Sequence, residues 1–169
     1  GSAQLFPNAG STSPVGAGVF SMISGGVLAS ESGIPSAIPT TRARVFVDLT
    51  GGHDSGLAIA ATSATAIPVT LQAFQNDGIT PAGNVTTRTL LGNGHIAAFA
   101  SEFITNLPPN FVGVLDVSAP TAFVALTLRT LFNARNDFLM TTFPVADLAS
   151  PAPPASPLIF PQIADGGGF

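Results

Sequence analysis

The chain of 169 residues has no cysteine, lysine, tryptophan or tyrosine. The absence of cysteine excludes disulfide bonds, thiolate metal sites and cysteine nucleophiles. The absence of lysine leaves five basic residues, all arginine, against nine acidic ones, and the formal net charge is −4. Phosphate backbones and anionic lipid surfaces are bound by clusters of lysine and arginine. The sequence therefore predicts neither nucleic acid nor an anionic membrane surface as a partner.

Charge of either sign is scarce, since 8% of the residues are charged against about 25% in an ordinary globular protein. The mean hydropathy is +0.48, and a monomer with so few charges has difficulty keeping its surface free of apolar patches. Two explanations are open: part of the surface is covered by copies of the chain or by a partner, or the surface is built from neutral serine, threonine and asparagine. We expect the first.

Long apolar runs are also missing. No segment reaches the roughly 18 apolar residues of a membrane-spanning helix, so no membrane insertion is expected. No basic region followed by an apolar region opens the chain, which predicts that a secretory signal is absent or already removed.

What the sequence does have is short alternating apolar runs separated by turn residues, such as Asn76-Asp77-Gly78 and Gly92-Asn93-Gly94. This pattern predicts an all-β fold, an antiparallel Ig-like β-sandwich. One short helix is expected near 101–107, with Ser101 as its cap and Pro108-Pro109 ending it. The expected strands are 15–23, 27–30, 42–49, 57–62, 67–75, 85–91, 95–99, 111–118, 122–132, 138–145 and 158–163.

The turns and prolines divide the chain into four parts. Residues 1–41 form an N-terminal strand and hairpin module with an extended linker, in which 34–41 should not pair continuously because of its prolines. Residues 42–148 form the β-sandwich core, with wider loops expected at 51–56 and 133–137. Residues 149–157 form a stiff proline-rich linker that can span about 25 Å. Residues 158–169 form a C-terminal strand.

Two patterns occur twice. An apolar strand with a central phenylalanine leads into a glycine turn at 44–53 and again at 158–169. A small residue, a proline and a strand occur at 13–21 and again at 119–127. Residues 13–53 and 119–169 therefore look like two copies of one module around a middle segment that occurs once. Coincidence among simple β patterns is the alternative.

The phrase Phe160-Pro161-Gln162-Ile163-Ala164-Asp165-Gly166-Gly167-Gly168-Phe169 resembles a recurrent signature of Ig-like β-sandwich repeats in large secreted bacterial proteins. Gly18-Val19-Phe20, Ser32-Gly33-Ile34-Pro35 and Val45-Phe46-Val47-Asp48 add to the resemblance. It implies a secreted, extracellular or cell-surface location and a non-catalytic structural or adhesive role. Members of that family normally continue into another strand after the glycines. This difference favours separate subunits joined end to end.

No catalytic, cofactor or metal site is predicted, and no cofactor is expected. The two histidines, His53 and His95, are not accompanied by a Gly-x-Ser-x-Gly nucleophile motif. Asp48, Asp54 and Ser55 could supply a few oxygens to Ca²⁺, which needs six to eight. The alternative, which we expect, is that Asp54 and Ser55 bond the backbone of their turn. The chain is therefore not expected to be an enzyme.

These observations favour a structural subunit of an extracellular filament or surface fibre. Copies would join by β-strand addition, in which main-chain hydrogen bonds give affinity and alternate side chains give register. The donor would be the C-terminal strand, or alternatively 3–6 or 15–23. The alternative function is a surface adhesin module that binds a glycan or protein through loops 51–56 and 133–137. The candidate interface residues are Leu158, Ile159, Phe160, Ile163, Val45, Phe46, Val47, Val19 and Phe20.

Overall fold

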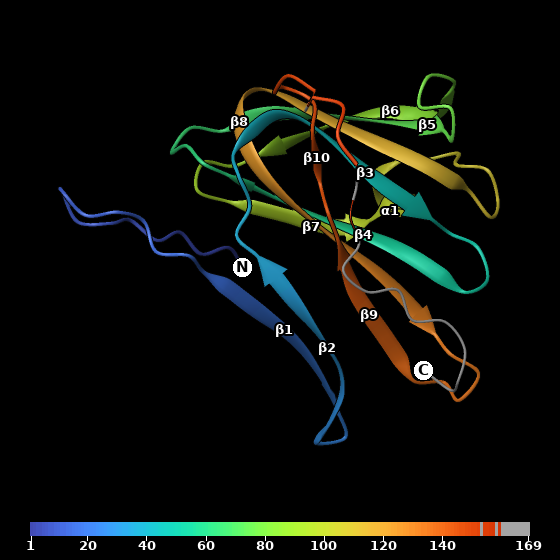
Figure 1. Ribbon diagram of the computed structural model, residues 1–169. Helices are drawn as coiled ribbons and strands as arrows, with labels where there is room; N and C mark the ends of the chain where they lie inside the picture. The colour runs from blue at the N-terminus through green and yellow to red at the C-terminus, as the bar shows by residue number, and fades with distance from the viewer. Residues whose placement is uncertain (153, 158, 160–169) are drawn as a thin grey trace.

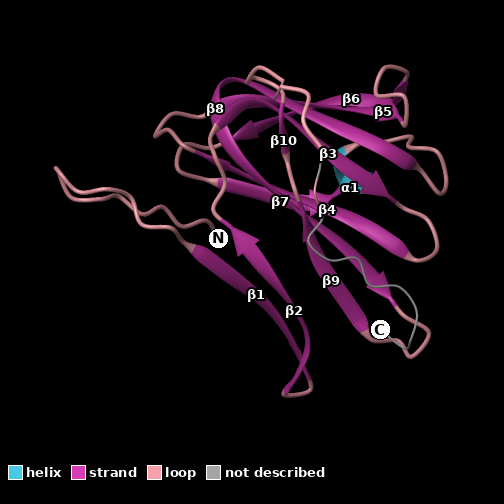
Figure 2. Ribbon diagram, in the orientation of Figure 1, coloured by secondary structure: helices cyan, strands magenta, loops and turns pink. Residues whose placement is uncertain are grey.

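A computed structural model describes residues 1–152, 154–157 and 159. This part of the chain contains ten strands and one short helix, arranged as in Figure 1. The expected class, an antiparallel all-β sandwich-like fold with one short helix, is confirmed; apart from this helix, the regular secondary structure in Figure 2 is all strand. The elements are β1 (Ala17–Ser24), β2 (Val27–Pro35), β3 (Thr40–Asp48), β4 (His53–Ala61), β5 (Ile67–Gln75), β6 (Pro81–Leu90), β7 (His95–Phe99), α1 (Ala100–Phe103), β8 (Val112–Phe132), β9 (Phe138–Phe143) and β10 (Ala146–Asp147).

The long strand β8 belongs to both layers of the body. Its first half pairs with β3 and β5, so that Asp116 lies opposite both Arg44 and Gln72. Its second half pairs with β4 and β9, so that Thr127 lies opposite both Leu57 and Phe143. One layer is therefore β10-β3-β8-β5-β6 and the other is β9-β8-β4-β7, with every pairing antiparallel.

The expectation of two strands, 111–118 and 122–132, is wrong, because the structure has the single strand β8 there. The ladder to β3 is interrupted between Ser118 and Phe123, where β8 passes from one layer to the other. Pro120, which lacks an N–H donor, lies in this interruption and costs no ladder hydrogen bond there.

The core lies between the two layers and follows the predicted alternation. On β3, Ala43, Val45 and Val47 are buried, whereas Arg42 and Phe46 are exposed. Period-two burial of apolar side chains is the main favourable term that fixes strand register. The largest fully buried side chains are Phe123, Ile59, Leu71, Leu90, Ile104, Leu115, Val47, Val69 and Val117.

The helix α1 is shorter than expected and begins one residue earlier. Phe99, not Ser101, is its N-cap, and the Glu102 carboxylate accepts a hydrogen bond from the Phe99 N–H at 2.7 Å. Phe103 and Ile104 are 3% and 1% exposed and close the core. The burial of these two side chains holds the segment in place, so the helix does not need further turns to be stable.

One loop expectation is also corrected. Residues 51–56 do not form a wide hairpin loop, because β4 already starts at His53 after the two-residue turn Gly51-Gly52, with φ of 57° and 81°. This turn carries the chain from one layer to the other. In the proline-containing stretch 34–41, Ile34 and Pro35 pair with Gly18 and Ala17, whereas residues 36–39 belong to no strand, so the stretch does not pair continuously, as expected.

The strands β1 and β2 form a separate two-stranded sheet that projects from the body (Figure 1). Gly25 and Gly26, with φ of 58° and 82°, form the turn between them. Both positive φ values are typical of the tight hairpin turns that match strand twist. Across the described ranges, no helix has the length and apolar character to cross a bilayer.

Candidate self-assembly site

The structure describes six of the nine predicted interface residues. They form three groups: two are buried in the core, two are exposed outside the hairpin, and two are exposed on the hairpin. Val45 and Val47 are 3% and 2% exposed and form part of this chain's own core, so they offer no surface to another copy. Phe46, between them, is 40% exposed, and its ring lies 6.0 Å from that of Phe143 on β9. Ile159 is 84% exposed. Leu158, Phe160 and Ile163 lie outside the described residues.

The third group, Val19 and Phe20, lies on β1, the outer strand of the projecting hairpin. Val19 is 63% and Phe20 47% exposed. Among the described residues β1 pairs with β2 alone, so its other edge carries unpaired N–H and C=O groups. No charged residue or proline interrupts β1. A long uncharged apolar edge of this kind is the usual template for pairing with another chain.

Sequence reasoning missed three further apolar side chains of the hairpin, Ile23, Val27 and Leu28, which are 68%, 69% and 55% exposed. The signal was present in the two glycines between two apolar runs, which predict a hairpin. Neither periodicity nor composition shows whether a hairpin packs on the body or stands away from it.

The hairpin is attached to the body through β9. The backbone N–H of Met140 donates to the Ser30 Oγ at 3.1 Å, and the Thr142 hydroxyl donates to the carbonyl of Gly33 at 2.9 Å. No ladder joins β2 and β9 among the described strands. The hairpin is thus held by side-chain hydrogen bonds and packing rather than by continuous sheet.

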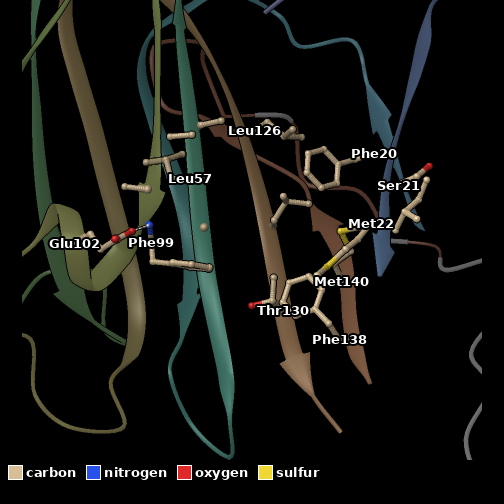
Figure 3. Close-up of a pocket in the computed structure, with 16 residues that line it drawn as sticks. Phe20, Ser21, Met22, Leu57, Phe99, Glu102, Leu126, Thr130, Phe138 and Met140 are labelled. Atoms are coloured by element: carbon tan, nitrogen blue, oxygen red, sulfur yellow. Dashed lines mark hydrogen bonds between the residues drawn. The ribbon is translucent and has the colours of Figure 1, made fainter. Parts of the chain in front are cut away.

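An apolar groove of about 620 Å³ lies between the hairpin and the outer surface of β4, β7 and β8. Figure 3 shows Phe20 and Met22 pointing into it from β1, and Phe138 and Met140 lining it from β9. Glu102 is the one charged residue of the lining, and its carboxylate is bonded to the Phe99 backbone. The groove is suited to apolar groups and offers no catalytic constellation.

The scarce charged residues are used to join strands. Asp116 on β8 accepts two hydrogen bonds from Arg44, at 2.5 and 3.1 Å, and one from Arg42 at 3.4 Å. The hydrogen bond to Asp116 raises the pKa of Arg44. Arg44 also donates to the carbonyl of Gly78 at 3.1 Å and lies 5.7 Å over the ring of Phe74. The cluster therefore ties β3, β5 and β8 together.

Asp48, at the end of β3, has the same structural role. One oxygen accepts from Arg129 at 2.5 Å and the other from the Thr50 hydroxyl and N–H, at 2.6 and 3.0 Å. The Ser55 hydroxyl accepts from the Asp48 N–H at 2.9 Å, and the His53 Nδ1 lies 3.9 Å from the carboxylate. Burial raises the pKa of Asp48, but the hydrogen bonds from Arg129 and Thr50 outweigh it and lower that pKa to about 2.

The side chains considered for Ca²⁺ thus make hydrogen bonds within the turn and, for Asp48, to Arg129 of β8. The Asp54 carboxylate accepts from the Ser55 N–H at 2.7 Å, as expected for a turn that bonds its own backbone. In the described ranges, no three histidine, aspartate or glutamate side chains gather in a way that could hold a metal ion.

Acid should remove the contribution of Asp48 to stability. Because its folded pKa lies below the ordinary value of 3.8, this contribution is complete above about pH 4 and is lost as the pH falls through about 2. The shift corresponds to about 2 kcal/mol. The difference in unfolding free energy between the wild type and Asp48→Asn, measured by urea titration, should shrink by that amount between pH 5 and 2. A constant difference would contradict the assignment.

Comparison with protein-family models, with curated proteins and with solved structures finds no match for this chain.

Proposed function

We propose that this chain is a structural subunit of an extracellular filament or surface fibre that assembles with copies of itself by β-strand addition. The observation that carries the proposal is the exposed apolar edge of β1, with Val19 at 63% and Ile23 at 68% exposure. Monomeric proteins usually protect such edges with charges, prolines or short strands. β1 is eight residues long and carries neither charge nor proline.

The composition supports the same proposal. With 8% charged residues, the surface has few groups that would oppose association. Four of the five arginines are paired with carboxylates, Arg42 and Arg44 with Asp116, Arg129 with Asp48, and Arg135 with Asp137. These pairs leave the formal net charge at −4, so the charges that oppose association are few.

The hairpin changes the role of one candidate donor. Residues 17–24 are already paired with β2, so this segment is better suited to accept a strand than to donate one. The donor is then the segment 158–163, or the N-terminal residues 3–6, of which Leu5 and Phe6 are 76% and 82% exposed.

Charges on β1 should abolish assembly. We expect the wild-type chain to show a mass that rises with concentration in light scattering and to form fibres visible by electron microscopy. The double variant Val19→Lys/Ile23→Lys should stay monomeric, because pairing with an uncharged apolar strand would take two lysine ammonium groups out of water.

The matched control is Ile79→Lys/Val85→Lys, which places the same charges on apolar side chains that are 78% and 60% exposed elsewhere. This control should assemble like the wild type. A wild-type chain that stays monomeric at every concentration would overturn the proposal, as would equal loss of assembly in both double variants.

The second candidate function is an adhesin module. Its two predicted contact segments lie at the same end of the molecule, because His53 of β4 is paired with Leu131 of β8. The loop at 133–137 is held by Asn133, whose side chain accepts from the N–H groups of Arg135 and Asp137, both at 2.9 Å. This function would give a monomer with saturable binding of a glycan or protein, a result that light scattering separates from assembly.

A further inference from the structure

The groove beneath the β1–β2 hairpin is an apolar surface that the described residues leave open. Its floor on β4 and β7 is made of small residues, Gly56, Ala58 and Ala97. Leu126 and Leu128 of β8 form the middle, as Figure 3 shows for Leu126. These small residues lie between larger apolar side chains, so the floor leaves space for the side chains of an added segment.

The groove continues beneath the base of the hairpin, where the ends of β1 and β2 and the N-terminal residues Ala3 and Leu5 of the same chain line it. A second hollow of about 470 Å³ shares Ala58 and Leu126 with the first and reaches Val124. The two hollows together follow the outer surface of β8 from Val124 to Thr130. At about 3.3 Å per residue this stretch is roughly 20 Å long. An extended segment of six residues has the same length.

We propose that this groove is the seat of the apolar segment 158–163 from a second copy of the chain, an inference that rests on the proposed function of self-assembly. The segment has six residues and no charge, and four of them are Leu158, Ile159, Phe160 and Ile163. Its length and apolar character match the groove. The proline-rich stretch 149–157, which precedes the segment in the sequence, would serve as a stiff tether between the two copies.

The exposure of Ile159 favours a second copy over the same chain as the source of this segment. Ile159 is 84% exposed in the single chain, so it is not seated on its own body. Pro161 lacks an N–H, and a segment bound through its side chains in a groove does not need that donor. Main-chain hydrogen bonds to the neighbouring edge of β1 are then an addition to side-chain burial.

Binding of a fluorescent peptide of sequence 156–165 to the full-length chain tests the seat. Fluorescence anisotropy, measured at chain concentrations too low for self-assembly, should show saturable binding of one peptide per chain. Ala58→Phe fills the floor of the groove and should weaken binding at least tenfold. Ala66→Phe, at an exposed position outside the groove, should leave it unchanged. A peptide of the same composition in scrambled order should not bind.

Ala97→Phe repeats the test from β7 at an exposed residue, where a folding defect is not expected. Equal peptide binding by the wild type, Ala58→Phe and Ala97→Phe would show that the groove is not the binding site. It would not contradict self-assembly. Assembly of the wild type without any peptide binding would overturn the choice of segment 158–163. Absence of both assembly and peptide binding would overturn the proposed function as well.

Discussion

Phe123→Ala is expected to lower the free energy of unfolding by about 3–5 kcal/mol, the range found for deleting a fully buried phenylalanine ring. Phe123 is 0% exposed. It lies on β8 opposite both Thr40 of β3 and Ala61 of β4, where the strand passes between the layers. Loss of the ring leaves a cavity that both layers border, so the surrounding structure can close it only in part. Urea unfolding monitored by circular dichroism measures the change.

The control for this experiment is Phe132→Ala at the end of the same strand. Phe132 is 57% exposed and contacts Phe138 at a ring distance of 5.1 Å, so the expected loss is about 1 kcal/mol. Phe123→Leu, which keeps most of the buried volume, should be intermediate and keeps the test informative if the alanine variant does not fold. Equal losses for Phe123→Ala and Phe132→Ala would show that β8 does not join the two layers as described.

Strand positions could be predicted from the sequence because alternation is a local signal. The strands at 67–75 and 95–99 have the bounds that the pattern indicated. The path between strands could not be predicted in the same way. Gly51-Gly52 has the local chemistry of a hairpin turn, yet it connects strands of different layers. Which layer a strand joins depends on contacts between distant residues.

The candidate site was predicted in part for the same reason. Val19, Phe46 and Val47 are all apolar residues in strand patterns; alternation on β3 separates the buried Val47 from Phe46, but only the packing of the body distinguishes Val47 from Val19. The groove could not be predicted at all, since it is formed by residues of β1, β4, β7, β8 and β9 that have no common spacing. A surface formed by the position of a hairpin over a sheet leaves no pattern in either segment.

Arg129→Met should destabilise the fold by about 3–5 kcal/mol, the range for removing one partner of a buried ion pair. The Asp48 side chain is 9% exposed, and its short hydrogen bond to Arg129 joins β3 to β8 across the layers. Without the guanidinium, burial keeps a charged carboxylate away from water with only Thr50 as a donor. Methionine retains most of the length and apolar stem of arginine, so the loss reports mainly on the charge.

The pH dependence distinguishes this electrostatic cause from a packing defect. In Arg129→Met, the hydrogen bond and the charge of Arg129 no longer lower the pKa of Asp48, so this pKa should rise from about 2. Protonation then relieves the buried charge in the variant, whereas it removes a favourable interaction in the wild type. The difference in unfolding free energy between the two proteins should therefore shrink from pH 7 to pH 3. Arg135→Met, which breaks the exposed pair with Asp137, should show only a small change. A loss in Arg129→Met that is constant with pH would mean that the arginine acts through packing alone.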